Sequence, residues 1–91
     1  MGDILIVDDE KDIRDLISDI LIDEGYSTSL AANSDETFQN ILDTMPKLII
    51  LDIWLKGSSL DGIDILKNIR KNNPSIPVVI IYGHGNIEIA V

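Results

Sequence analysis

Three aspartates in this sequence follow directly after short apolar runs. Residues 4–7 are apolar and precede Asp8 and Asp9, and residues 48–51 are apolar and precede Asp52. Such runs are typical of buried strands in a parallel sheet, where both faces are covered. Because the carboxyl ends of parallel strands lie at one edge of the sheet, the sequence predicts that these three carboxylates converge there.

Converging carboxylates repel one another, which raises some of their pKa values unless a cation offsets the charge. Mg²⁺ prefers oxygen ligands, keeps several waters, and is usually held by one or two carboxylates together with phosphate oxygens. A carboxylate beside such an ion can act as a nucleophile toward a phosphoryl donor, because the ion neutralises the oxygens of the transferring group. The pattern therefore predicts a magnesium-dependent site that forms an aspartyl phosphate.

A simpler interpretation of Asp8 and Asp9 is that they only cap the helix that follows them, as acids at a helix start often do. For an isolated pair of aspartates this interpretation would be favoured. The additional strand-terminal acid, Asp52, and the alternation of strands with helices favour the metal site instead.

The first helix and second strand follow the aspartate pair. Apolar residues recur three and four positions apart after Lys11, which predicts an amphipathic helix that ends at Gly25. A mixed segment of β-branched, serine and apolar residues at 26–32 predicts a second, more exposed strand. The apolar positions of the helix are Ile13, Leu16, Ile17, Ile20 and Leu21.

Two more helices flank the run that ends in Asp52. Asn33 or Ser34 can cap the first of them, which Pro46 ends, and Asp61 can cap the second, which frays near Pro74. The apolar face of the first comprises Phe38, Ile41, Leu42 and Met45, and that of the second comprises Ile63, Leu66 and Ile69.

The last part of the sequence predicts a fourth strand at 77–82 and a turn at 83–85. Asn86 can then cap a helix that has barely begun when the chain stops. Strands that alternate with helices imply a parallel sheet covered on both faces, because each right-handed crossover needs a helix to return the chain.

Composition agrees with one α/β domain. The chain has 91 residues, 45% of them hydrophobic, which is enough for one core. It has no Cys and therefore neither a disulfide nor a Cys-based zinc site. No run approaches the ~20 apolar residues that span a bilayer, so we expect a cytoplasmic protein with no membrane contact. The net charge of −9 disfavours nucleic-acid phosphates, so we expect no direct nucleic-acid contact by this segment.

The sequence resembles the response-regulator receiver family at several motifs. They are Ile-Leu-Ile-Val-Asp-Asp-Glu at 4–10, Leu-Asp-Ile at 51–53 and Asp-Gly at 61–62, and the resemblance covers essentially the whole chain. Within the family, residues 52–62 and 83–88 are most similar to the NtrX-type nitrogen regulators. The resemblance implies a flavodoxin-like (CheY-like) doubly wound parallel sheet of order 2-1-3-4(-5). We expect residues 1–91 to be an incomplete receiver domain, truncated after the fourth strand, with the fourth helix only begun and the fifth strand and last helix absent.

The resemblance also implies what the converging acids do. Asp52 would accept a phosphoryl group from a sensor histidine kinase. Asp9, Asp52 and the backbone carbonyl of Trp54 would bind Mg²⁺ directly, and Asp8 would assist through water. The chain would then be the phosphoacceptor of a two-component system that controls a transcriptional output. It would not be an enzyme beyond its own phosphorylation and dephosphorylation.

Two features depart from the family pattern. The family has Thr or Ser at the end of the fourth strand, where its hydroxyl binds the phosphoryl group, and this sequence has Tyr82. The phenol oxygen lies several bond lengths farther from the backbone and cannot simply replace that hydroxyl. The family's phosphate-binding Lys ends the fifth strand and has no counterpart here. Without that strand, residues 78–81 would form an unprotected edge, so we expect a homodimer or edge-strand exchange.

Two other functions stay open. A pseudo-receiver would keep the fold as a protein-interaction module that does not switch, as Tyr82 suggests. An enzyme or nucleotide-binding protein on a similar sheet would need a Gly-rich phosphate cradle after the first strand, where Asp8 and Asp9 stand instead. His84 is interpreted as a loop residue near the site and not as a catalytic group.

Overall fold

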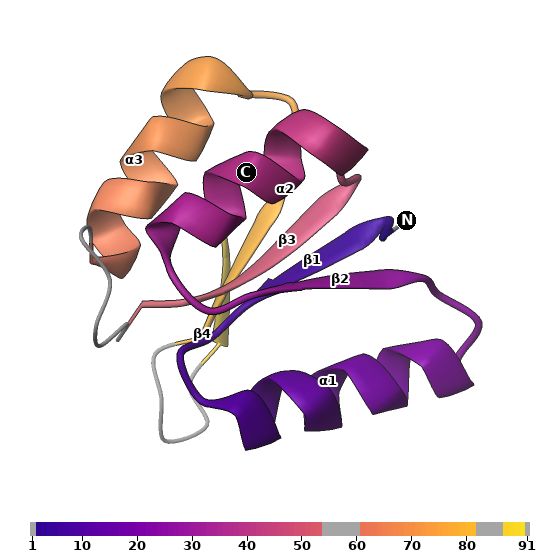
Figure 1. Cartoon of the computed structure of the whole chain (residues 1–91). Helices are drawn as coiled ribbons and strands as arrows, with labels where there is room; N and C mark the ends of the chain where they lie inside the picture. Colours follow the sequence, from indigo (N-terminus) through magenta and orange to yellow (C-terminus); the bar gives the residue numbers. More distant parts are fainter. Residues whose placement is uncertain (1, 54–60, 82–86, 91) are drawn as a thin grey trace.

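The strands of this protein form one sheet with a parallel centre. The computed structural model describes residues 2–53, 61–81 and 87–90. The sheet order is β2-β1-β3-β4-β5, and all pairs are parallel except β4 with β5 (Figure 1). The strands are β1 (Ile4–Val7), β2 (Thr28–Ala31), β3 (Leu48–Asp52), β4 (Val78–Ile81) and β5 (Ile87–Ala90). The predicted order 2-1-3-4 and the doubly wound class are confirmed.

Three helices connect the parallel strands and cover the two faces of the sheet unequally. They are α1 (Lys11–Asp23), α2 (Ser34–Thr44) and α3 (Gly62–Asn72). Helix α1 lies on one face, and α2 and α3 lie together on the other (Figure 1). None of the helices in the described ranges is long and apolar enough to cross a membrane.

The helices begin at the predicted caps. The Asn33 side chain accepts a hydrogen bond from the Glu36 amide at 2.9 Å, and Asp61 accepts one from the Asp64 amide at 2.9 Å. Asn33 and not Ser34 is therefore the cap of α2, and each cap satisfies an amide that has no partner within its helix. Gly25 ends α1 with a φ of +95°, in the left-handed region that glycine adopts readily.

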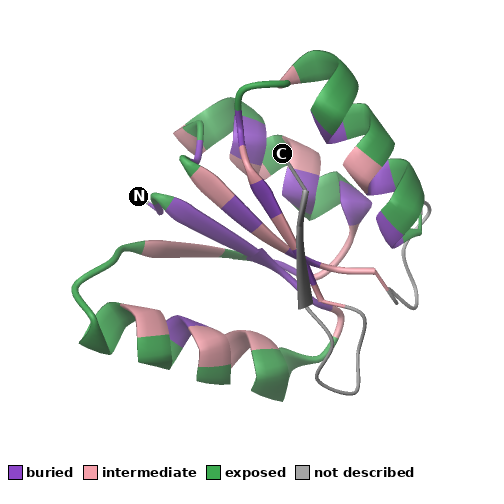
Figure 2. Cartoon of the chain, turned by 180° about the vertical axis from the view of Figure 1, so that it is seen from behind, coloured by how far each residue is buried: buried purple, intermediate pink, exposed green. Residues whose placement is uncertain are grey.

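The hydrophobic core lies between the sheet and the helix pair α2 and α3. Alternate residues of the central strands point to this face, and they pack against inward residues of the two helices. Figure 2 shows buried positions along the central strands and on α2 and α3. The strand residues of this cluster are Leu5, Val7, Ala31, Ile49, Leu51, Val78 and Ile80, and the helix residues are Ile41, Ile65 and Ile69. All of them are less than 5% exposed, so the ends of β1 and β3 rest on a closely packed layer.

The predicted apolar faces of α2 and α3 are partly wrong. In α2, Ile41 is buried, but Leu42 is 76% exposed and Met45 is 61% exposed. Met45 follows the last helical residue and has a φ of +46°, so it no longer continues the helical face. In α3, Ile65 and Ile69 are buried while Ile63 is 48% exposed, because the helix is rotated so that Ile65 faces the sheet.

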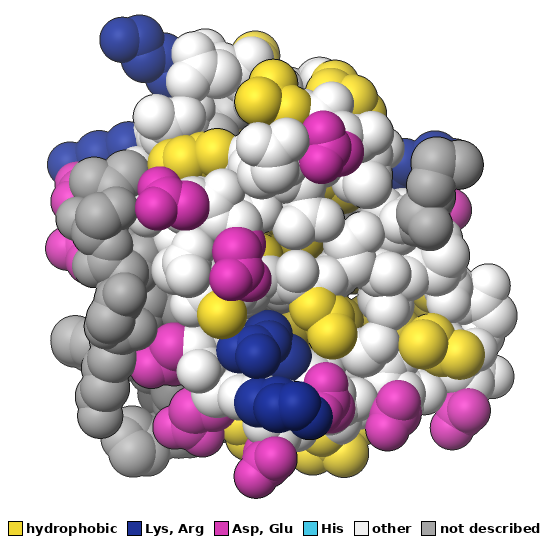
Figure 3. All heavy atoms as spheres, viewed as in Figure 1, with side chains coloured by type: hydrophobic (Ala, Val, Ile, Leu, Met, Phe, Trp, Pro, Cys, Tyr) yellow, Lys and Arg dark blue, Asp and Glu magenta, His cyan; other side chains and the backbone are white. Residues whose placement is uncertain are grey.

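The other side of the molecule retains exposed apolar side chains on α1. Ser18 is the buried residue of that helix, whereas Leu16 and Ile20 are 56% and 55% exposed. Among the described helices α1 alone lies on its face of the sheet, so part of its apolar stripe points to solvent (Figures 1 and 2). On the face seen in Figure 3, apolar side chains are scattered among acidic ones, in keeping with the net charge of −9.

The expectation of a helix beginning at Asn86 is wrong. Residues 87–90 form β5, which pairs antiparallel with β4 so that Ile81 lies opposite Ile87 and Val78 opposite Ala90. Pairing provides hydrogen-bond partners for backbone groups along β4, whereas a helix would leave that edge open. β4 therefore does not present the free edge that we expected to drive strand exchange, and β5 is antiparallel, unlike the parallel fifth strand of the expected fold.

Candidate functional site

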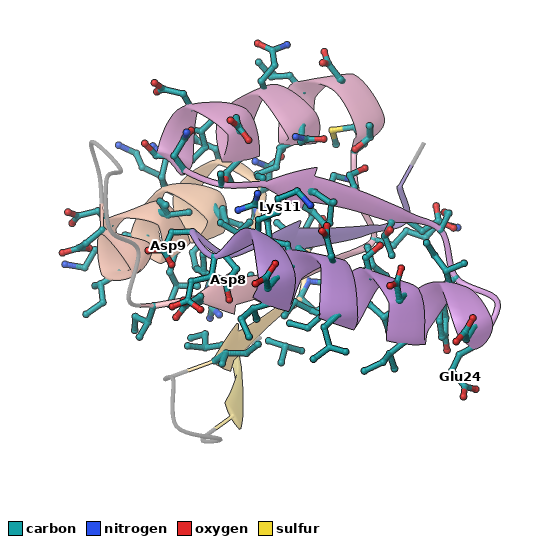
Figure 4. The ribbon with its side chains drawn as sticks, turned by 60° about the horizontal axis from the view of Figure 1, so that its bottom comes forward. Asp8, Asp9, Lys11 and Glu24 are labelled. Atoms are coloured by element: carbon teal, nitrogen blue, oxygen red, sulfur yellow. The ribbon has the colours of Figure 1, made fainter. Side chains whose placement is uncertain are left out.

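The three predicted aspartates do converge. In the sheet, Val7 lies beside Leu51, so the chain leaves β1 for Asp8 and Asp9 next to Asp52, the last residue of β3. One carboxylate oxygen from each of the three lies within 4.8 Å of the others. Figure 4 shows Asp8 and Asp9 at the end of α1 from which Lys11 projects, with Glu24 at its opposite end.

Asp8 is held in place by hydrogen bonds on several of its atoms. Its amide donates to the Ala31 carbonyl at the end of β2, at 3.1 Å. One of its carboxylate oxygens accepts from the Glu10 amide at 2.9 Å, and its carbonyl accepts from the Arg14 guanidinium at 2.7 Å. Three hydrogen bonds on Asp8 therefore hold the turn between β1 and α1. The Glu10 side chain, which precedes α1, does not cap the helix.

The charge on the Asp8 carboxylate is unfavourable in this position. The residue is only 5% exposed. Its burial, opposed in part by the Glu10 hydrogen bond and reinforced by the charges of Asp52, Asp9 and Glu10, raises the Asp8 pKa from 3.8 to about 6. A cation among these groups would lower that pKa again, because it favours the charged form.

The donor set fits a hard divalent cation. All three side chains offer carboxylate oxygens, which Mg²⁺ and Ca²⁺ prefer and which softer metals do not select. Asp9 and Asp52 are both partly exposed, so an ion and its waters can reach them. Residues Asp9 and Asp52 would contact the ion, and the more deeply buried Asp8 would bind one of its waters.

Asp52 is positioned by the pairing of β3 with β4. It lies beside Ile81 in the register of the two strands, and the next amide, that of Ile53, donates to the Ile81 carbonyl at 3.0 Å. Its carboxylate therefore projects from a strand end whose backbone is paired with β1 at Leu51 and with β4 at Asp52 itself. Trp54, Tyr82 and His84 lie outside the described residues, so the roles expected for them remain predictions.

Two residues near the site were not identified from the sequence as contributors. Arg14 contacts the Asp8 carbonyl, six residues earlier in the chain. Gly62, the first residue of α3, approaches β3 so closely that a Cβ added there would overlap the Ile53 backbone. A glycine in the first turn of a helix was a signal for such a contact, whereas nothing in the sequence distinguishes Arg14 from an exposed helical arginine.

Comparisons with known proteins match nearly the whole chain. The family model described as the response regulator receiver domain matches residues 4–91. The nitrogen assimilation regulatory protein NtrX of Azorhizobium caulinodans is 55% identical over 89 residues, covering 98% of this chain and 20% of that protein. A putative NtrX-like response regulator of Rickettsia bellii is 52% identical, with 98% of this chain and 19% of that protein covered.

A solved structure has the same fold. The crystal structure of the receiver domain of NtrX from Brucella abortus is 54% identical and superposes with a TM-score of 0.87, covering 91% of this chain and 69% of that one. The chain spans about a fifth of the length of the two curated relatives above, at 20% and 19%. Strand order, converging aspartates and family match agree, and the chain belongs to the response regulator receiver domain family.

Proposed function

We propose that this chain is the phosphoacceptor of a two-component system, with Asp52 as the residue that takes the phosphoryl group. The observation that carries the proposal is the convergence of Asp8, Asp9 and Asp52 within 4.8 Å at the carboxyl edge of the sheet. Asp9, Asp52 and the backbone carbonyl of Trp54 would bind Mg²⁺, and Asp8 would assist through water. When bound, the ion neutralises charge on the oxygens of the transferring group.

The transfer needs one nucleophile and one leaving group. A carboxylate oxygen of Asp52 attacks the phosphorus of a phosphohistidine, the new P–O bond forms, and the P–N bond breaks. The electron pair of that bond stays on the imidazole nitrogen, which takes up a proton from water. Asp8 and Asp9 contribute by holding the metal side of the site, and the partial exposure of Asp52 leaves it accessible to a donor on another protein.

The source and the consequence of phosphorylation lie outside these residues. The donor we propose is a sensor histidine kinase, and the output we propose is transcriptional, as in a nitrogen assimilation regulator such as the Azorhizobium relative. The net charge of −9 supports an output through other segments, because this one repels nucleic-acid phosphates. Phosphorylation would then shift a pre-existing equilibrium between conformations and alter a protein interface, including that of a homodimer.

The test is intact mass after incubation with acetyl phosphate, with and without Mg²⁺. We expect a gain of ~80 Da that requires the metal and disappears in Asp52→Ala, because the new bond is an acyl phosphate on that side chain. Asp43→Ala is the matched control, since Asp43 is an exposed acid of α2 and should leave the gain intact. A folded, unsubstituted chain that gains no mass would contradict the proposal.

Tyr82 supports a second candidate function. A phenol in place of the family's short hydroxyl favours a pseudo-receiver, which keeps the fold and binds partners without switching. The two candidates differ in what phosphorylation does. Sedimentation of the phosphorylated and unphosphorylated chain would show a change of oligomeric state for a switch and none for a pseudo-receiver.

A further inference from the structure

The Arg14 side chain reaches back from the first turns of α1 to the turn that carries the acids. Its guanidinium donates a partly buried hydrogen bond of 2.7 Å to the carbonyl oxygen of Asp8. The Arg14 amide also donates to the Glu10 carbonyl at 3.0 Å, so its own backbone is part of the regular helix. Arg14 thus connects a rigid element to the segment from which two of the three carboxylates project.

The atom that Arg14 contacts gives this bond its importance. The carbonyl of Asp8 belongs to the peptide group between Asp8 and Asp9, and that group is planar. Its orientation sets the direction in which the chain leaves Asp8 and therefore where the Asp9 side chain points. Two further bonds of the turn, from the Asp8 amide to Ala31 and from the Glu10 amide to the Asp8 carboxylate, hold other atoms.

We infer that Arg14 is a positioning residue for the metal site, because it fixes the peptide between Asp8 and Asp9 and so keeps both carboxylates directed at the ion. The inference rests on the proposed function, since it assumes that these acids bind Mg²⁺. Hydrogen-bonding partners of metal ligands typically change metal affinity by about 10–100-fold when they are removed. Arg14 contacts the Asp8 backbone and not a carboxylate that binds the ion. We therefore expect its removal to change Mg²⁺ affinity by an amount near the lower end of this range.

The sign of the effect separates positioning from simple electrostatics. Arg14 carries a positive charge beside a site for a cation, and removing that charge by itself should strengthen Mg²⁺ binding. Positioning predicts the opposite, because the carboxylates lose their alignment. We therefore expect Arg14→Met, which keeps an apolar stem of similar reach, to weaken Mg²⁺ binding by about 10-fold.

Lys11 provides a matched control on the same helix. It is also basic and also in the first turn, but its exposed side chain forms an ion pair with Asp15 at 2.6 Å and not a bond to the turn. Lys11→Met removes the same charge without removing a contact to Asp8. We expect its Mg²⁺ affinity to equal or slightly exceed that of the unsubstituted chain.

The experiment is a Mg²⁺ titration followed by backbone amide NMR shifts at pH 7.5, with the thermal midpoint measured for each variant. Weaker binding by folded Arg14→Met, together with undiminished binding by Lys11→Met, supports the inference. Should Arg14→Met fail to fold, Arg14→Lys serves instead. It keeps the charge but loses the planar donor group, so weaker binding cannot come from the charge.

Two results would count against the inference in different ways. If the folded Arg14 variants bind Mg²⁺ as tightly as the unsubstituted chain, or more tightly, Arg14 does not position the site and the proposed function is unaffected. If the unsubstituted chain binds no Mg²⁺, the proposed function fails and the inference fails with it. A loss of thermal stability in Arg14→Met without a change in Mg²⁺ affinity would assign the bond to folding alone.

Discussion

At the scale of single residues, the charge on the buried Asp8 carboxylate lowers the stability of the folded, metal-free protein. A carboxylate that is 5% exposed and has two other acids beside it is harder to ionise than one in water. The resulting pKa of about 6 means that the folded, metal-free protein binds a proton at Asp8 more tightly than the unfolded chain does. Folding and ionisation at this position therefore compete, and a metal ion bound among the three acids would relieve the competition.

This competition predicts the pH dependence of the metal-free protein. The Asp8 pKa is raised on folding from 3.8 to about 6, so its contribution to stability is full below pH 3.8 and is lost as the pH rises through about 6. Asp8→Asn removes the ionisation and keeps an oxygen that can accept from the Glu10 amide. Above pH 7 we expect this variant to be more stable than the unsubstituted chain by on the order of 1–3 kcal/mol, with no gain near pH 4.

The measurement is urea denaturation with a chelator present, at pH 4, 5.5 and 7.5, for the unsubstituted chain, Asp8→Asn and Asp43→Asn. Asp43 is exposed, so its substitution should change stability little at any of these pH values. With Mg²⁺ added at pH 7.5, the order should reverse, because the chains that keep Asp8 gain more stability from the ion than Asp8→Asn, which retains only Asp9 and Asp52 among the three acids. Equal stability of Asp8→Asn and the unsubstituted chain at high pH, without metal, would show that the Asp8 charge is not destabilising.

At the scale of elements, α3 lies very close to the residue that follows β3, the second strand that ends in an acid. The first residue of α3 is Gly62, and any side chain there would overlap the Ile53 Cα and lie 2.5 Å from the Ile53 carbonyl oxygen. Ile53 directly follows Asp52. A larger residue at position 62 would therefore have to move either the helix or the strand end that carries Asp52.

Gly62→Ala is expected to destabilise the fold by about 2–3 kcal/mol, because the neighbouring atoms are backbone and cannot rotate away. Gly25→Ala is the matched control. Gly25 has a φ of +95° and open space around its Cα, so an alanine there meets strain in its own backbone but no neighbour, at about 1 kcal/mol. Chemical denaturation of both variants measures their free energies of unfolding. Equal losses of stability would show that overlap with the Ile53 backbone adds nothing to the cost of Gly62→Ala.

The elements also show which features of local sequence were reliable. The cap at Asp61 and the stop at Gly25 were predicted correctly, and the cap of α2 was narrowed to Asn33 or Ser34, because each depends on a few neighbouring residues. The faces of α2 and α3 were predicted less well. Isoleucine and leucine occur on more than one side of these helices, and only the packing against the sheet selects Ile65 over Ile63.

At the scale of the whole molecule, the sheet has a protected centre and less protected borders. β1 and β3 each pair with a neighbour on both sides, whereas β2 pairs with β1 alone. All four residues of β1 are buried, while β2 has one buried residue. The acids of the site project from the ends of the two central strands, where the backbone is hardest to distort.

Amide hydrogen exchange should reflect this arrangement. We expect amides in β1 and β3 to exchange only by global unfolding and amides in β2 to exchange faster through local opening, because fewer neighbours must separate. Exchange followed by NMR at pH 7 would measure protection strand by strand. Protection of β2 as strong as that of β1 would contradict the view that the site rests on the most stable part of the sheet.

Resemblance to the receiver family supplied the predicted strand order, and the sequence patterns by themselves determined the parallel α/β class and the convergence of Asp8, Asp9 and Asp52. These follow from short-range patterns, since an apolar run that ends in an acid is visible locally and parallel strands must place such ends at one edge. Tertiary structure alone decided the burial that raises the Asp8 pKa, the bond from Arg14 to the Asp8 carbonyl and the close approach at Gly62. It also decided that residues 87–90 pair with β4 as a strand. Each of these depends on the distance between atoms of different elements, which packing fixes and local sequence does not specify.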